Sequence, residues 1–259
     1  TKFIASHPLN SNHKFMAVMN FILWQIGARI LAKKVIVPWV GDSSFVCRTG
    51  DTGLTGNLYC GFMEYRDMLF LLHALQANET FVDVGANIGA YTILASKVIK
   101  SKTIAFEPIA DSVDRLKDQL QINRIEKIVD VRNMGIGDKR GELFFTNNND
   151  TVNKVSLAGD QVNTTKVEVG TLDEELISGV QYFLKIDVEG FEYNVLVGAD
   201  KILSSKNVAA VIIELNGSGI EFGHSDEEIH QKMLSFDFLP VDYDPFTRSL
   251  TMTNSYNKT

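Results

Sequence analysis

The alternation of short apolar runs with helical patterns after residue 78 constrains this fold more than any other feature. Runs rich in β-branched and aromatic residues recur at 81–84, 103–106, 128–131, 182–186 and 208–213. Most of the intervals between them carry the periodicity of helices, and strands separated by helices form parallel sheets. Two further strands, near 239–243 and 249–253, have the pattern of an antiparallel pair. We therefore predict one α/β domain over residues 78–259.

The segment before residue 78 lacks this regular alternation of strands and helices. Its most apolar stretch, residues 15–31, is interrupted by Asn20, Gln25 and Arg29. A membrane-spanning helix needs about 20 mostly apolar residues, so we expect no transmembrane segment here. We expect a helix that packs on the core rather than against a membrane or a partner. Short strands at 35–37 and 44–48 and a helix at 64–75 complete a predicted N-terminal helical and β cap, residues 1–77.

Five local expectations concern the second half of the chain. Residues 141–146 read as an extra hairpin, and the stretch 147–165, rich in Asn, Thr and Asp, as a mobile loop. The alternation at 166–169 predicts an edge strand. The unbroken apolar run at 208–213 predicts a strand buried on both faces. A single helix is expected between the strand at 182–186 and Leu203.

Composition narrows the choice of partners and compartment. Among 259 residues, 25 Lys and Arg face 32 Asp and Glu, which gives a net charge of −7. A net anion without a basic run is a poor match for nucleic acid. Cys47 and Cys60 are too few for a disulfide framework or a zinc site, although one bridge between them stays open. The default is a reducing compartment, and we expect a cytoplasmic protein.

The strongest chemical signal is a glycine turn between a strand and a helix, Asp83-Val-Gly-Ala-Asn-Ile-Gly89. Glycine lets the backbone turn sharply and approach a ligand closely, and open α/β sheets bind ligands at the carboxyl ends of their strands. The pattern is not Gly-x-Gly-x-x-Gly, so it matches pyrophosphate binding poorly. Glu107 follows Asp83 by 24 residues, about the spacing at which a carboxylate meets a ribose diol. Together these features predict a nucleoside site.

A second acidic group follows the strand at 182–186. Asp187, Glu189 and Glu192 suit a base, a cation ligand or an ammonium partner. Glu189 and Glu192 are explained as well by the start of a helix, whose dipole favours acidic residues. Asp187 lies at a buried strand end, where a carboxylate needs a partner. We therefore favour a functional role for Asp187.

These motifs, in this order on this strand pattern, resemble the FkbM family of S-adenosylmethionine-dependent methyltransferases, a branch of the class I (Rossmann-like) methyltransferases. The resemblance covers about residues 57–243. It is carried by FVDVGANIGAYT (81–92), AFEP (105–108), TLD (171–173), LKIDVEGFE (184–192) and IIEL (212–215). It implies a mostly parallel seven-stranded sheet, with an antiparallel C-terminal hairpin and helices on both faces.

The resemblance also implies three parts of a cofactor site. The methionine part of S-adenosylmethionine would lie on the glycine turn, at Asp83, Gly85, Ala86, Asn87 and Gly89. The ribose would meet Glu107, beside Pro108. The adenine would face the turn at 134–138, which includes Gly135 and Asp138. Asp187 would lie near the sulfonium and the incoming nucleophile.

Methyl transfer to an alcohol requires a group that takes the proton of the hydroxyl. Asp187 is the first candidate for this base. Glu214 would orient the acceptor, although a buried carboxylate tied to backbone amides explains it equally well. His224, in the loop at 217–225, is another candidate base, with a structural or solvent-exposed role as its alternative. A divalent metal held by Asp187 and Glu214 stays open, since no spacing demands it.

The predicted function is transfer of a methyl group to a hydroxyl of a sugar, a glycan or a glycosylated small molecule, because the family acts mostly on such oxygens. Tyr243, Phe246 and the loop at 147–165 would form an acceptor surface. Alternatives are another acceptor, such as a natural product, a lipid or a protein amine, and a non-catalytic cofactor-binding module. A nicotinamide oxidoreductase is disfavoured, because its glycine fingerprint and its Tyr-x-x-x-Lys are missing from the sequence. Since Thr1 stands where Met is usual, part of a larger multidomain glycan-modifying enzyme is a further hypothesis.

Overall fold

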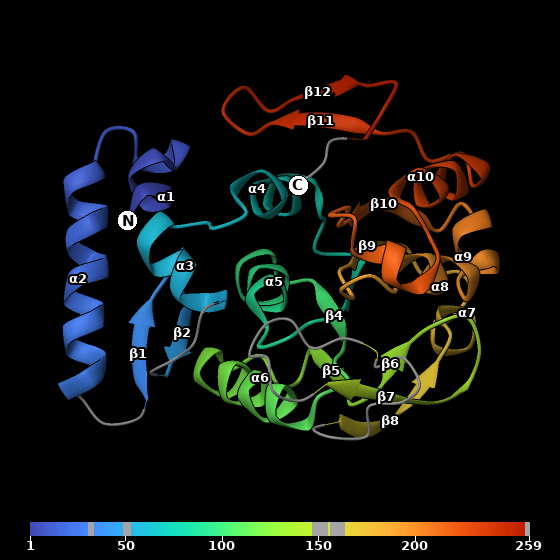
Figure 1. Cartoon of the computed structure of the whole chain (residues 1–259), viewed down its shortest axis with the longest axis horizontal. Helices are drawn as coiled ribbons and strands as arrows, with labels where there is room; N and C mark the ends of the chain where they lie inside the picture. The colour runs from blue at the N-terminus through green and yellow to red at the C-terminus, as the bar shows by residue number, and fades with distance from the viewer. Residues whose placement is uncertain (31–33, 49–52, 147–154, 156–163, 257–259) are drawn as a thin grey trace.

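A five-stranded parallel sheet forms the centre of the molecule (Figure 1). The computed structural model describes residues 1–30, 34–48, 53–146, 155 and 164–256. The strand order is β10-β9-β3-β4-β5. The bounds are β3 (Thr80–Val84), β4 (Lys102–Phe106), β5 (Val129–Arg132), β9 (Tyr182–Ile186) and β10 (Val208–Ile213). The predicted α/β class with a parallel sheet is confirmed.

The predicted count of seven strands in one sheet is wrong for the described residues. The C-terminal strands β11 (Val241–Asp244) and β12 (Ser249–Met252) pair with each other as an antiparallel hairpin but extend no other sheet. The hairpin lies over α4 (Tyr65–Ala74) and contacts it through side chains, with the rings of Tyr243 and Phe70 5.3 Å apart. Side-chain packing on α4, and not backbone pairing with another sheet, therefore attaches this hairpin to the rest of the domain.

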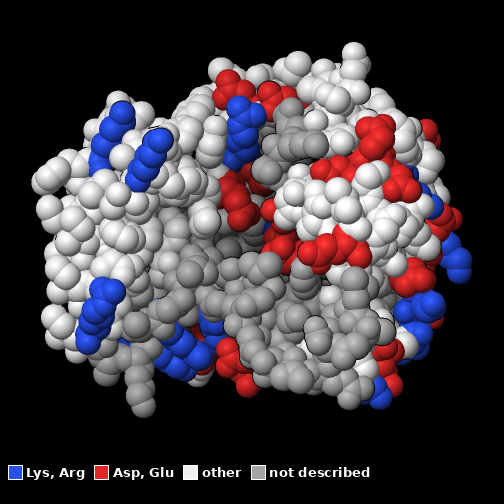
Figure 2. All heavy atoms as spheres, in the orientation of Figure 1, with Lys and Arg blue, Asp and Glu red and all other residues white. Residues whose placement is uncertain are grey.

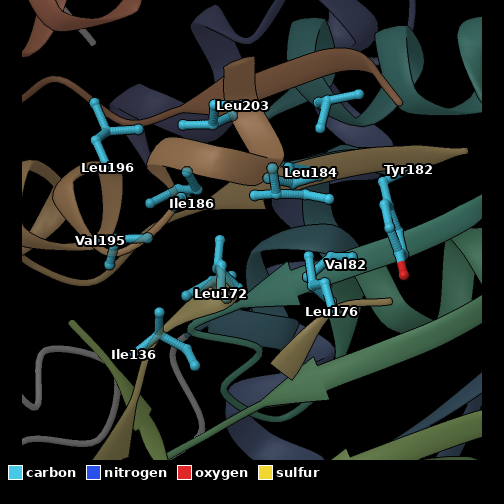
Figure 3. Packing of buried hydrophobic residues seen from close by; sticks show 14 of the residues in the cluster. Val82, Ile136, Leu172, Leu176, Tyr182, Leu184, Ile186, Val195, Leu196 and Leu203 are labelled. Carbon is cyan, nitrogen blue, oxygen red and sulfur yellow. The ribbon is translucent and has the colours of Figure 1, made fainter. Parts of the chain in front are cut away.

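Helices cover both faces of the sheet. One face carries Phe81 and Phe183 and packs against α4, α5 (Ala90–Ile93), its π-helical continuation η2 (Leu94–Ile99) and α6 (Ala110–Asn123). The other face carries Val82, Leu184 and Ile186, which pack in the largest cluster of buried residues (Figure 3). The helices on this side are α7 (Leu172–Glu175), α8 (Glu192–Val197), α9 (Asp200–Ser204) and α10 (Asp226–Ser235). The helix expected up to Leu203 is thus two helices, separated at 198–199.

Two strand predictions need correction. A small sheet contains β6 (Gly135–Ile136), β8 (Thr164–Gly170) and β7 (Gly141–Thr146), in the order β6-β8-β7. The strand expected at an edge, β8, is therefore central, because alternation of Val167 and Val169 reports one buried face and not the number of neighbours. The strand β10 was predicted to be buried on both faces, but it lies at an edge of the sheet and pairs only with β9 among the described strands. Its side chains after Val208 are therefore at most half-buried. Of the predicted loop at 147–165, residues 147–154 and 156–163 lie outside the described residues.

The N-terminal cap contains helices and a small β-sheet, as predicted. Its elements are α1 (Lys2–Ser6), η1 (Pro8–Asn10), α2 (Lys14–Ile30), β1 (Val35–Pro38), β2 (Ser44–Cys47) and α3 (Gly53–Cys60). They lie together at one end of the molecule (Figure 1). Since α4 packs against the central sheet, a domain division at residue 77 stays a prediction.

Side-chain amides of α6 attach the cap to the sheet. Gln119 accepts a hydrogen bond from the Val46 backbone N–H (2.8 Å) and donates one to the Val46 carbonyl (2.9 Å). Asn123 does the same with the N–H (2.9 Å) and the carbonyl (2.7 Å) of Ser44. Both amides are 2% exposed. They satisfy the edge of β2 that faces away from β1, where a third strand would otherwise be needed.

Three further points about the cap have structural outcomes. Cys47 and Cys60 are both buried, and no disulfide joins them. No described helix has the length and apolar character to cross a membrane. The expectation that the apolar helix packs on the core holds for one side of α2, where Ala17 is buried and Phe21 meets Tyr59. The opposite side of α2 is apolar and exposed.

Candidate functional site

The strand order brings the acidic residues of the sequence motifs to one edge of the sheet. Glu214, Asp187, Gly85 and Glu107 follow β10, β9, β3 and β4 in the order of the sheet. The strands β4 and β5 lie on one side of β3, and β9 and β10 lie on the other. This is the topological switch point at which open α/β sheets bind ligands. Two adjoining cavities open there.

The two cavities share lining residues from the glycine turn, Gly85 and Asn87, and from the loop after β9, Asp187 and Glu189, which we call the Asp187 loop. The smaller, the strand-end cavity, measures about 70 Å³ and is lined by residues that include Asn87, Glu107, Pro108, Met134, Gly135, Ile136, Asp187 and Phe191. The larger, the cap cavity, measures about 320 Å³ and is lined by residues that include Leu54, Asn57, Met63, Glu64, Asp83, Ala86, Gly89, Tyr91, Lys185, Asp187, Glu189 and Glu214. The cap therefore builds part of the wall of the larger cavity.

The two glycines of the turn are required by contacts within the protein. Gly85 has φ +81°, and a Cβ atom added there would lie 1.8 Å from the Asp187 carbonyl oxygen. Gly89 has φ +91°, and its Cβ would lie 2.3 Å from Cδ1 of Leu116. The sequence predicted close approach to a ligand, whereas in the structure the missing side chains make room for β9 and α6. Both glycines nevertheless line the cap cavity.

Two buried oxygens in this turn have no donor among the described residues. Asp83 is fully buried, and its Oδ2 accepts a hydrogen bond from the Thr92 hydroxyl at 2.7 Å, while its Oδ1 has no partner. Oδ1 of Asn87 is also buried and unpaired. Burial raises the pKa of Asp83 despite the charge of Lys185, its register neighbour on β9. These oxygens are suited to a donor group, above all a cationic one.

Glu107 is held in place by two backbone groups. Its carboxylate accepts hydrogen bonds from the N–H of Asn87 (2.8 Å) and of Ile109 (2.9 Å), and the residue is only 6% exposed. Burial raises the pKa of Glu107 to about 7, although these two bonds oppose the shift. A carboxylate has about four acceptor positions, so two remain for hydroxyl groups in the strand-end cavity.

Asp187 and Glu214 form a carboxyl pair next to a buried lysine. Lys185 donates to Oδ2 of Asp187 at 2.7 Å. Burial would raise the pKa of Asp187, but Lys185 and a hydrogen bond from Glu214 outweigh it, so the pKa is lowered. Burial and the charge of Asp187 raise the pKa of Glu214 to about 8. At neutral pH Asp187 is therefore ionised, and Glu214 keeps a proton that it donates to Asp187.

Three further residues of the cap cavity were not predicted from the sequence. The Tyr91 hydroxyl donates to Oε2 of Glu64 at 2.7 Å. Nζ of Lys185 lies 4.7 Å from the centre of the Tyr91 ring. The signal for Lys185 was available, because residues two apart on a strand share a face, and Lys185 stands two before Asp187. No local signal identifies Glu64, since only the fold brings the cap to this edge.

Most of the predicted site residues line one of the two cavities, but two do not. Asp138 lies outside their lining, and its carboxylate is 3.9 Å from Lys139. His224 is stacked on the ring of Tyr193, with centroids 3.9 Å apart, and lines neither cavity.

Three more residues that the sequence analysis singled out lie outside the lining of the two cavities. Glu192 accepts from the N–H groups of Val188 and Gly190, at 3.1 Å each, and so stabilises its own turn. Tyr243 packs on α4, and Phe246 lies near Tyr65, with ring centroids 6.3 Å apart. Neither aromatic residue lines either of the two cavities. Within the described ranges, no three His, Cys, Asp or Glu side chains are grouped as metal ligands.

The parallel sheet, the glycine turn and the carboxylate after the second strand define a Rossmann-like α/β enzyme with a nucleoside crevice. The pattern of the methyltransferase FkbM domain matches residues 83–240, and the chain belongs to this family. The hexuronic acid methyltransferase AglP of Haloferax volcanii is 30% identical over 180 residues, which are 67% of this chain and 71% of that protein. The chain is therefore a methyltransferase, and S-adenosylmethionine is the cofactor of its family.

Solved structures offer partial likenesses. The TYW2 protein of P. horikoshii, in complex with MeSAdo, is 15% identical, with a TM-score of 0.33 over 48% of this chain and 50% of that one. The precorrin-6y C5,15-methyltransferase of Geobacter metallireducens is 12% identical, with a TM-score of 0.41 over 74% of this chain and 84% of that one. The chain thus spans half of the first structure and most of the second. Nothing about the acceptor follows from likenesses at this level.

Proposed function

We propose that this methyltransferase acts on a hydroxyl oxygen of a sugar, either free or part of a glycan or a glycosylated small molecule. The observation that carries the proposal is the Asp187–Glu214 pair, which lies at the carboxyl end of the sheet and borders the cap cavity. An alcohol has to lose its proton as it is methylated, and an ionised carboxylate in the cavity can accept that proton. When bound, S-adenosylmethionine supplies a methyl group on a positively charged sulfur.

The residues present fit this cofactor. The unpaired buried oxygens of Asp83 and Asn87 would accept hydrogen bonds from its ammonium group. Glu107 would hold the ribose hydroxyls through its free acceptor positions. Met134 and Phe191, which line the strand-end cavity, would contact the adenine. Titration of Glu107→Gln with S-adenosylhomocysteine tests the ribose contact; we expect affinity to fall by about 1–3 kcal/mol, the usual cost of an unpaired buried polar group.

In this proposal Asp187 accepts the hydroxyl proton and three neighbours keep it ready. Lys185 keeps Asp187 ionised and fixes its orientation through the 2.7 Å hydrogen bond. Glu214 shares its own proton with Asp187 and points the pair at the acceptor. Glu64 orients Tyr91, whose ring packs against Lys185. Positioning of the acceptor oxygen would supply much of the acceleration.

The charge of the cap cavity favours a neutral acceptor over a uronate. Its lining includes the acidic side chains of Asp83, Asp187, Glu64 and Glu189 and the protonated Glu214, against one cation, Lys185, among the described residues. Figure 2 shows Asp and Glu side chains around the hollow in the middle of this face. An acceptor carboxylate would meet like charges there, which costs affinity. The expected acceptor therefore differs from that named for the Haloferax relative.

Product analysis with a labelled methyl group tests this proposal. We expect a neutral hexoside to be converted to a methyl ether, which is stable to alkali, and a hexuronate to react poorly. A methyl ester released by alkali would overturn the proposal, as would an N-methylated amino sugar formed in preference to the ether. The Asp187→Asn variant should lose about 10²–10⁴-fold in kcat, the usual contribution of a general base. Loss of the charge beside the buried Lys185 should lower the melting temperature, so retained affinity for S-adenosylhomocysteine is the control that separates lost chemistry from misfolding.

Other parts of the predicted function stay predictions. These are the cytoplasmic location, the lack of a nucleic-acid partner, a place in a larger glycan-modifying enzyme, and the open question of a metal. Assay with and without EDTA tests the last of these directly.

A further inference from the structure

The outward side of α2 is apolar, which is unusual for a helix at the surface of a protein. Six of its large apolar side chains are between 41% and 76% exposed: Phe15, Met16, Ile22, Leu23, Ile26 and Ile30. At 100° per residue they fall in one sector of the helix, along a length of about 25 Å. Among the other described residues, the exposed apolar side chains are either single, such as Ile177 and Ile220, or lie on the β11–β12 hairpin, where Val241 pairs with Met252. Single exposed apolar residues are ordinary, whereas a continuous stripe marks an interaction surface.

The charge around this stripe indicates what covers it. Residues 1–48 contain six Lys and Arg and one acidic residue, Asp42, so their net charge is 6 − 1 = +5. Two of these cations, Lys34 and Arg48, are paired with Asp118 of α6. The rest of the chain then carries −7 − 5 = −12. Lys14 and Arg29, both exposed, lie on α2 itself. In Figure 2 the end of the molecule over α1 and α2 shows Lys and Arg and no Asp or Glu.

We propose that α2 rests on an anionic lipid surface, with its apolar stripe in the lipid headgroup region and the basic residues against the lipid charges. Helices that lie in the membrane interface combine an apolar face with Lys and Arg at its border, and α2 has both. The strongly acidic remainder of the chain would be repelled by the same anionic surface. This repulsion would orient the molecule with its cap toward the lipid. A second copy of this chain is a poorer occupant, because a two-fold axis at α2 would bring two caps of +5 together.

This contact is independent of which acceptor the enzyme uses. The helix α2 packs against α3, and α3 contributes Leu54 and Asn57 to the cap cavity. The cap therefore has two separate surfaces: one lines the cavity and the other carries the lipid-binding stripe. Changes on the outer stripe should leave the chemistry intact.

Flotation with phosphatidylcholine vesicles, with and without phosphatidylglycerol, tests the proposal. We expect the full chain to float with the anionic vesicles and to be released as salt rises, since screening weakens the charge term. The double variant Ile22→Asn/Ile26→Asn should lose about ten-fold or more in partition, because apolar burial drives insertion. Lys14→Gln/Arg29→Gln should lose about 25-fold at low salt, at about five-fold per basic residue.

Controls separate lipid binding from folding and from self-association. Ile177→Asn changes an isoleucine that is 73% exposed, outside the cap, and should float like the wild type. All variants should keep the melting temperature of the wild type, since the altered side chains are exposed. Equal flotation on neutral vesicles, or no flotation at all, would overturn the proposal. So would a stable dimer in sedimentation that Ile22→Asn/Ile26→Asn converts to monomers, because a second copy would then occupy the stripe.

Discussion

The carboxyl edge of the sheet and the N-terminal cap contribute to the cap cavity in different ways. At the sheet edge each functional side chain is fixed by neighbouring strands, as Lys185 fixes Asp187 and two backbone groups fix Glu107. The cap adds Leu54, Asn57, Met63 and Glu64 from outside the sheet, and it is held by side-chain amides. From this difference we propose that the sheet edge carries methyl transfer and that the cap helps to choose the acceptor.

The largest expected effect comes from filling the contact between the glycine turn and β9. Gly85→Ala would place a carbon 1.8 Å from the Asp187 carbonyl oxygen, so the turn or the Asp187 loop has to move. We expect binding of S-adenosylhomocysteine to be lost in calorimetry. Gly179→Ala is the matched control: its φ is +85° and no atom lies within 4 Å of the added carbon. The control should show only the strain of positive φ, about 1–2 kcal/mol, and full cofactor binding.

The attachment of the cap can be broken without touching either cavity. Gln119→Leu removes both partners of the Val46 backbone, and each unpaired buried group costs about 1–3 kcal/mol. We expect the free energy of unfolding, measured in urea, to fall by about 2–5 kcal/mol, and KM for the acceptor to rise more than the Kd of the cofactor. Gln121→Leu, on the exposed side of the same helix, should change neither quantity. An equal loss of cofactor affinity would contradict the division between the two regions.

The pH dependence of kcat should report the carboxyl pair. Below pH 8 Glu214 is protonated and donates to Asp187, which lowers the basicity of that carboxylate. As pH rises through about 8 the shared proton leaves, Asp187 becomes the stronger base, and kcat should rise several-fold. Glu214→Gln keeps a neutral donor beside Asp187 and should show a flat profile over this range. A rise that persists in this variant would assign the titration to another group.

The smallest effect should come from the charge that the cap contributes. Glu64→Gln removes one carboxylate from the cap cavity and retains an acceptor for the Tyr91 hydroxyl. We expect KM for a hexuronate to fall a few-fold relative to that of a neutral hexoside, while the Kd of the cofactor stays the same. Preference between the two acceptors, measured in competition, is the sensitive readout. An unchanged ratio of the two KM values would show that Glu64 of the cap does not take part in acceptor selection.

The parts of the fold that depend on local pattern could be predicted from the sequence. The strands β3, β4, β5 and β9 lie within one or two residues of their predicted ranges, because apolar runs bounded by helical periodicity are local signals. The neighbours of a strand are set by distant segments, and this is why β8 was predicted at an edge and lies between two strands. The separate hairpin at β11 and β12 has the same cause, since pairing and packing give one sequence pattern.

The candidate site shows the same limit. Asp187 and Glu107 were found because each stands directly after an apolar strand, where the topology fixes its position. Glu64 could not be found, since its place at the cavity depends on how the cap docks. His224 was a reasonable candidate in a loop near the strand ends, but its ring stacks on Tyr193. Side-chain direction in a loop is decided by tertiary contacts that a single sequence does not reveal.

The amide pair on α6 has a consequence for protein engineering. Gln119 and Asn123 form four hydrogen bonds with the backbone N–H and C=O groups of β2. These two amides could bind the backbone of any extended strand whose N–H and C=O groups lie opposite them, whatever its side chains. A foreign cap could therefore be grafted onto this α/β core if it presents one free strand edge to α6. A library of such caps could be screened for new acceptors while the residues of the sheet edge stay unchanged.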